Sequence, residues 1–258
     1  MCIRDRFGFD TQHTNFNSYE NALTTSTVPS LRHYWISPTQ GNVYAEPVVV
    51  KGVVYVGTST GYLYAFDART GNQLWSYQAP NLFGFGTNSV TVSNGVVYAA
   101  AGYHTGSKKE GGELDAFNAL TGAKLWTASL VSSTTSPIVA NGMVYVGTID
   151  HDLYAFSTSG CGNPVCPPVW TTSTGGITSS PSIDNGYIYV GLSSNRLGIV
   201  DATTGKLYQS FNTASPVTAQ VVVDGVLYVS TLVVPGSTAA NLNAYNLSTH
   251  KLLWSYTD

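Results

Sequence analysis

The densest cluster of potential metal ligands in the sequence is the run Asp150-His151-Asp152. Carboxylate and imidazole groups of this kind can hold a divalent cation. Three consecutive residues cannot all converge on one ion, however, when they form the tip of a tight hairpin. We therefore predict no metal site at this run.

A second candidate for chemistry is the pair Cys161 and Cys166, in the loop CGNPVC. Two cysteines this close, in a loop with glycine and proline between them, predict a disulfide and an oxidising compartment. A metal site would need further ligands, and no histidine or third cysteine lies nearby in the sequence. The remaining cysteine, Cys2, belongs to residues 1–6 (MCIRDR), which lack the apolar core of a signal peptide and which we interpret as foreign to the natural protein.

Composition and charge do not point to a nucleic acid or a membrane as partner. Only 10% of the 258 residues are charged and the formal net charge is −3, which gives no indication of nucleic acid or an anionic membrane as partner. No apolar run approaches the length of a transmembrane segment. The sequence also lacks the motifs G-x-S-x-G and H-E-x-x-H and a phosphate-cradling loop, so no catalytic residue is assigned.

The elements that position these residues follow from an internal repeat. A glycine, two apolar residues and a tyrosine recur at intervals of 39 to 47 residues. A period near 40 residues made of short strands is typical of propeller blades with four strands each. The five copies begin at Gly52, Gly95, Gly142, Gly186 and Gly225.

A second motif, A-x-D-x-x-x-G-x-x-x-W, follows each copy. Its Asp or Asn can accept backbone hydrogen bonds in a turn, its Gly tolerates a positive φ, and its Trp can bury a flat ring against the neighbouring blade. In the third copy the motif is interrupted and resumes at a tryptophan, in the fourth Gln209 stands in place of tryptophan, and in the fifth His250 stands in place of glycine. The predicted blade-docking residues are Asp67, Gly71, Trp75, Asn118, Gly122, Trp126, Trp170, Asp201, Gly205, Asn246 and Trp254, with Trp35 ahead of the first blade.

These five linked copies resemble the tryptophan-docking motif of the PQQ-repeat β-propellers, the quinoprotein alcohol dehydrogenase-like family. The resemblance covers roughly residue 31 to the C-terminus and implies an all-β propeller of seven or eight blades in the complete protein. This family includes dehydrogenases that use pyrroloquinoline quinone (PQQ) with calcium. It also includes the lipoprotein scaffold of bacterial outer-membrane assembly, so the resemblance alone does not imply a bound quinone.

We divide the chain into an N-terminal leader and coil, residues 1–30, and a propeller, residues 31–258. Within the propeller, Leu31–Ser37 is predicted to be an outermost strand without a blade of its own, carrying the docking tryptophan Trp35. Because the fifth unit has its own outer strand, we expect the chain to form an open arc of five blades, with two or three blades of the ring absent. The predicted blades span about 43–77, 86–128, 133–172, 177–211 and 216–256.

Glu46 is the candidate for a ligand-binding residue. Aligned on the repeat, its equivalents are Ser89, Ser136, Ser180 and Ala219. These positions are predicted to open the innermost strand of each blade and to line the central channel. The resembling dehydrogenases place an acidic residue near this strand in their first blade, although further from the following proline. A solvated channel carboxylate is the alternative role.

The leading functional hypothesis is a secreted or envelope propeller without catalytic activity, which binds a protein or a glycan through its loop faces. The alternative is a fragment of a PQQ-dependent oxidoreductase, with PQQ and calcium as cofactors. Against that alternative, the sequence has no adjacent cysteine pair of the kind that resembling dehydrogenases place beside the quinone. No cofactor, nucleic acid or transmembrane segment is expected.

Overall fold

A computed structural model describes most of the chain between residues 24 and 257. The described residues are 24, 26–79, 89–103, 111–132, 134–149, 152–213, 215–232, 241–249 and 251–257. Within them the structure has twenty strands, arranged as five sheets of four antiparallel strands each. The described residues include one short 3₁₀ helix, Val28–Ser30, and no helix long and apolar enough to cross a membrane.

Each sheet is one blade, and its four strands follow one another along the chain. Blade 1 contains β1 (Val48–Val50), β2 (Val53–Gly57), β3 (Tyr62–Asp67) and β4 (Gln73–Gln78). Blade 2 contains β5 (Thr91–Ser93), β6 (Val96–Tyr103), β7 (Gly111–Asn118) and β8 (Lys124–Leu130). Blade 3 contains β9 (Ile138–Ala140), β10 (Met143–Gly147), β11 (Asp152–Ser157) and β12 (Trp170–Ser173). Blade 4 contains β13 (Ser182–Asp184), β14 (Tyr187–Leu192), β15 (Arg196–Asp201) and β16 (Leu207–Asn212). Blade 5 contains β17 (Val217–Val223), β18 (Val226–Thr231), β19 (Asn241–Asn246) and β20 (Leu252–Thr257).

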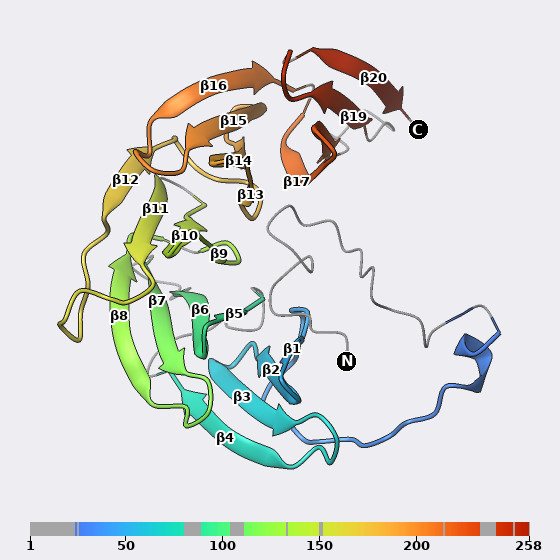
Figure 1. Ribbon diagram of the computed structural model, residues 1–258, viewed down its shortest axis with the longest axis vertical. Coiled ribbons are helices and arrows are strands. Elements are labelled where there is room, and N and C mark those ends of the chain that lie inside the picture. Colours follow the sequence, from blue (N-terminus) through green and yellow to red (C-terminus); the bar gives the residue numbers. More distant parts are fainter. Residues whose placement is uncertain are drawn as a thin grey trace.

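The five blades lie side by side around an open arc (Figure 1). The first strand of each blade lies toward the centre of the arc, and the fourth strand forms its outer edge. Strands that meander outward from an axis in this way define a β-propeller. The prediction of an all-β propeller with five four-stranded blades is therefore confirmed.

Two-residue turns explain why the first and second strands of each blade pair so regularly. In blade 2 the turn is Asn94-Gly95, whose φ angles are 49° and 78°. Two consecutive positive φ angles define a type I′ turn, which matches the twist of an antiparallel hairpin and favours Asn-Gly. The same backbone conformation recurs at residues 51–52, 141–142, 185–186 and 224–225.

Most of the hydrophobic core lies between consecutive blades, and a smaller cluster of Val56, Tyr64 and Phe66 lies on blade 1 alone. Four clusters of buried residues each combine side chains from two neighbouring blades. In the cluster between blades 1 and 2, for example, Leu63 and Val97 are fully buried. Each inner blade thus packs on both faces, which explains why its strands carry apolar residues on both sides.

The prediction of an outermost strand at Leu31–Ser37 is wrong, because this segment forms no strand. A strand requires a ladder of hydrogen bonds to a partner, and the described residues contain no strand paired with this segment. It runs as irregular chain toward the outer part of blade 1 (Figure 1). Its Trp35 nevertheless packs on blade 1, with the ring centroids of Trp35 and Phe66 6.4 Å apart.

Candidate functional site

The geometry of the docking residues is clearest between blades 1 and 2. Trp75 is 8% exposed, and its Nε1 donates a hydrogen bond to the Ala119 carbonyl at 3.0 Å. The Tyr55 hydroxyl donates to the same oxygen at 3.1 Å. A Cβ added to Gly122 would lie 2.7 Å from the indole, so the ring rests directly on the glycine backbone. The tryptophan of one blade thus covers the turn of the next blade.

The same arrangement recurs at two further positions of the motif. The indole of Trp35 covers Gly71, and that of Trp170 covers Gly205. Trp254 rests on no glycine turn among the described residues and is 45% exposed. In the four docking turns led by Asp or Asn, a side-chain oxygen accepts backbone N–H bonds from the second and third residues that follow it. The four side chains are Asp67, Asn118, Asp201 and Asn246.

Hydrogen bonding in these turns also changes the titration of the two aspartates. The pKa of Asp67 is lowered, first by the side-chain and backbone hydrogen bonds from Thr70 and then by the Arg69 amide. The pKa of Asp201 is lowered by equivalent bonds from Thr204 and Thr203. Both carboxylates act as stable acceptors in a turn, which does not suit a proton-transfer role at neutral pH.

The positions aligned with Glu46 form a chain of hydrogen bonds from blade to blade. The Glu46 amide donates to Ser89 Oγ at 3.2 Å, the Ser89 amide to Ser136 Oγ at 3.0 Å, and the Ser136 amide to Ser180 Oγ at 3.2 Å. The serine hydroxyls therefore link the segments that lead into the innermost strands of four consecutive blades. A serine side chain is small enough to fit where the backbones of neighbouring blades approach this closely.

Blade 5 replaces the serine with a residue that sequence alignment did not identify. Ala219 occupies the aligned position, but the neighbouring Gln220 makes the contact with blade 4. Its Nε2 donates to the carbonyls of Ser180 and Tyr189 at 2.5 and 3.0 Å, and its Oε1 accepts from Ser179 Oγ at 2.6 Å. The signal available in the sequence was a glutamine directly before the apolar run Val221–Val223.

The remaining candidates for chemistry differ in what the structure shows. Cys161 and Cys166 form a disulfide. In the run Asp150-His151-Asp152, the first two residues lie outside the described residues, and Asp152 accepts a hydrogen bond from the Tyr154 hydroxyl at 3.2 Å. Across the described part of the chain, no three His, Cys, Asp or Glu side chains gather as metal ligands.

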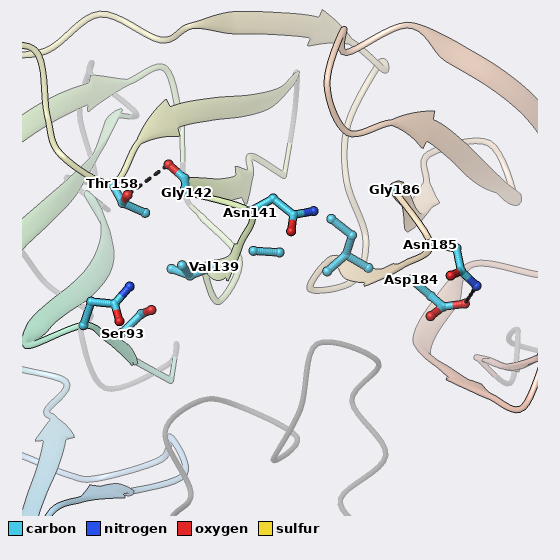
Figure 2. Close-up of a pocket in the computed structure, with 11 residues that line it drawn as sticks. Ser93, Val139, Asn141, Gly142, Thr158, Asp184, Asn185 and Gly186 are labelled. Carbon is cyan, nitrogen blue, oxygen red and sulfur yellow. Dashed lines mark hydrogen bonds between the residues drawn. The ribbon is translucent and has the colours of Figure 1, made fainter.

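A polar cavity of about 530 Å³ opens among the hairpin turns of blades 2, 3 and 4 (Figure 2). Its lining comes from the turns between the first and second strands, together with the start of the loop after β11. It therefore lies at the opposite end of the innermost strands from Glu46. The lining residues are Ser93, Asn94, Val139, Ala140, Asn141, Gly142, Thr158, Ile183, Asp184, Asn185 and Gly186.

The chemistry of this cavity is that of hydrogen-bonding recognition. Figure 2 shows Asn141 between the turn that carries Ser93 and the turn that carries Asp184 and Asn185. Asn185 Nδ2 donates to Asp184 at 2.9 Å, and Thr158 Oγ1 donates to the Gly142 carbonyl at 2.9 Å. The lining offers amide donors and acceptors, a few apolar side chains and a single titratable group, Asp184. That combination suits binding through polar contacts rather than acid–base chemistry.

Blades with this repeat, turn and docking geometry define the class of PQQ-repeat β-propellers. The family model described as "Outer membrane protein assembly factor BamB" matches residues 17–208 and again 168–258. The chain therefore belongs to this family.

Relatives of two kinds share the sequence pattern. The chain is 30% identical over 151 residues to quinohemoprotein alcohol dehydrogenase from Comamonas testosteroni, covering 54% of this chain and 21% of that protein. It is 28% identical over 159 residues to outer membrane protein assembly factor BamB from Yersinia pestis, covering 56% of this chain and 40% of that protein. The sequence match thus spans less than half the length of each of these relatives.

Solved structures of both kinds share the fold. The crystal structure of the Comamonas testosteroni quinohemoprotein alcohol dehydrogenase matches with a TM-score of 0.76 and 18% identity, over 98% of this chain and 49% of that chain. BamB from Moraxella catarrhalis matches with a TM-score of 0.62 and 22% identity, over 84% of this chain and 62% of that chain. At these identities the likeness establishes the fold and leaves the function open.

Proposed function

We propose that this protein is a non-catalytic scaffold of the cell envelope that binds a protein partner through the face holding the polar cavity. The observation that carries the proposal is the cavity itself, in which three equivalent turns present Asn94, Asn141 and Asn185 to the outside. Membership of the family described by an outer membrane assembly factor supports a role in protein assembly. The Cys161–Cys166 disulfide supports an oxidising compartment.

Exposed amides on rigid turns favour binding to a protein surface for a physical reason. Each Asn side chain offers both a donor and an acceptor and can therefore match a partner's backbone. The turns are fixed by type I′ geometry and by packing of the strands behind them, so little conformational entropy is lost on binding. Recognition then depends on several turns acting together across neighbouring blades.

Site-specific photocrosslinking in the source organism tests this proposal. A photoreactive residue in place of Asn141, in the full-length protein, is expected to give a discrete adduct with a protein. Thr60 provides the matched control, because it is exposed and lies in the turn between β2 and β3, at the opposite end of the strands. Adducts of equal yield from both positions, or none from Asn141, would contradict the proposal.

A second candidate function, a PQQ-dependent oxidoreductase, is favoured by the identity to the quinohemoprotein alcohol dehydrogenase. Calcium takes six to eight oxygen ligands, commonly including several carboxylates or carbonyls. The hydrogen-bonded positions aligned with Glu46 supply hydroxyl groups, and those of Ser89 and Ser136 already accept backbone N–H bonds. This donor set does not fit a calcium and quinone pair.

Adding PQQ with calcium to the purified protein separates the two functions. We expect neither stoichiometric binding nor alcohol-dependent dye reduction. Stoichiometric binding that is lost in Glu46→Ala would replace the scaffold proposal with the oxidoreductase.

A further inference from the structure

Blade 3 closes its outer hairpin differently from the other blades. Blades 1, 2 and 4 join their third and fourth strands by a short turn led by Asp or Asn, as at Asp67. Blade 3 instead uses residues 158–169, closed on themselves by the Cys161–Cys166 disulfide. Ser157 stands where the leading Asp or Asn would be, and its hydroxyl lies 2.8 Å from that of Ser159.

The disulfide loop reaches across to the outer strand of the preceding blade. The Thr127 amide, in β8, donates to the Pro164 carbonyl at 2.8 Å, and the Cys166 amide donates to the Thr127 carbonyl at 2.8 Å. Thr127 and Val165 thus form a parallel β-bridge between blade 2 and blade 3. On the loop side, the residues of this bridge are Pro164, Val165 and Cys166, which all lie within the six residues that the disulfide closes.

The tryptophan beneath the loop depends on this contact. Trp126 is 4% exposed, and a Cβ on Gly160 would lie 2.7 Å from its ring, so the loop lies directly on the indole. Trp75 and Trp170 donate from Nε1 to a carbonyl of the following blade. Trp126 Nε1 has no hydrogen-bond partner among the described residues. The position of the loop, rather than an indole hydrogen bond, therefore keeps Trp126 covered.

The two cysteine residues differ in exposure. Cys161 is exposed, whereas Cys166 is 5% exposed and belongs to the hydrophobic cluster that contains Trp126 and Phe156. A thiol in solution can therefore reach the Cys161 side of the disulfide. The loop also lines a cavity of about 520 Å³ beside Trp126, and its first residue, Thr158, lines the polar cavity as well.

We propose that the Cys161–Cys166 disulfide is a redox-sensitive latch: it fixes the blade 3 loop that is hydrogen-bonded to Thr127 of blade 2 and that lines the cavities on that face. A dithiol opens the latch in two steps. One thiolate attacks the Cys161 sulfur, and Cys166 leaves as a thiolate that takes up a proton. The second thiol of the reductant then displaces Cys161, which leaves two protein thiols and an oxidised reductant. This latch goes beyond the proposed function and does not depend on it.

Hydrogen exchange of backbone amides, measured on the full chain with and without dithiothreitol, tests the latch. Reduction is expected to speed exchange at Thr127 and Cys166 by at least about fivefold, because the bonds across the junction lose their constraint. Thr178, whose amide donates to Gly191 within blade 4, provides the matched control and is expected to keep its protection. No partner protein is needed, so failure here leaves the scaffold proposal standing.

The double variant Cys161→Ser with Cys166→Ser completes the test. It is expected to exchange like the reduced protein and to be unaffected by dithiothreitol. Unchanged exchange at Thr127 on reduction would overturn the latch. Equal loss of protection in every blade would overturn it too, because the disulfide would then support the whole fold rather than one junction.

Discussion

The junction between blades 1 and 2 and the junction between blades 2 and 3 each bury an indole, but they hold it by different means. Trp75 combines stacking on Gly122 with a hydrogen bond to the Ala119 carbonyl. Trp126 has the stacking but no hydrogen bond, and a disulfide-closed loop bridges to its strand instead. A covalent constraint within the loop can therefore stand in for a polar contact that the altered turn no longer provides.

A second difference concerns charge. The junction between blades 1 and 2 buries Asp115, which is fully buried and pairs with Lys124 at 2.9 Å. The Lys124 ammonium also lies 5.0 Å from the centre of the Tyr77 ring. In the junction between blades 2 and 3, the Tyr98 hydroxyl donates to the Thr158 carbonyl, just as the Tyr55 hydroxyl donates to the Ala119 carbonyl in the first junction. Burial raises the pKa of Tyr98 to about 12.

The largest expected effect is the difference in stability loss between removing a buried indole, Trp75, and removing a half-exposed one, Trp254. Trp75→Ala should lower the free energy of unfolding by about 3–5 kcal/mol, because it removes a buried aromatic ring and leaves a cavity. Trp254→Ala should cost far less, since its side chain is 45% exposed. Chemical denaturation of both variants measures the difference. Equal losses would show that docking on the next blade does not determine the stability of these rings.

The next effect concerns the covalent constraint at the second junction. Replacing both cysteines of the disulfide with serine should destabilise the protein by about 2 kcal/mol, the modest value expected for a short closed loop. The comparison predicts that Trp126→Ala then costs less in this background than in the wild type, because the loop no longer holds the ring. Additive losses in a double-mutant cycle would contradict that coupling.

A finer substitution isolates the hydrogen bond. Phenylalanine keeps an aromatic ring but removes the indole N–H, so Trp75→Phe loses a bond that Trp126→Phe does not have. The loss at Trp75 should exceed the loss at Trp126 by about 1 kcal/mol. Thermal denaturation of the two variants compares them directly. A larger loss at Trp126 would mean that its buried N–H is in fact satisfied.

The smallest effect uses pH to probe the buried carboxylate. Burial raises the pKa of Asp115, and the Thr127 and Lys124 side chains oppose that rise. An acid whose pKa is higher in the folded state favours folding at low pH, and this contribution is lost as pH rises from about 4 through the folded-state pKa. The wild type should therefore gain stability relative to Asp115→Asn as pH is lowered from 7 to 4. Urea denaturation across that range tests the sign.

Much of the fold was predictable from the sequence because its determinants are local. A turn such as Asn94-Gly95 specifies its hairpin through backbone sterics, and the spacing of the copies counts the blades. The pairing of Cys161 with Cys166 followed from their closeness in one loop. Leu31–Ser37 was predicted wrongly as a strand, because its apolar and aromatic residues indicate burial and not the presence of a ladder partner.

The sequence by itself determined the units of this protein: the strands, the turns, and which blades carry a docking tryptophan and a docking glycine. The tertiary structure alone decided how the units meet. It placed Gln220 rather than Ala219 against blade 4, set the disulfide loop beside Thr127, and brought three equivalent turns around one cavity. The physical reason is range. Hairpins form between residues a few positions apart, whereas contacts between blades join residues roughly 40 positions apart and depend on the packing of whole sheets.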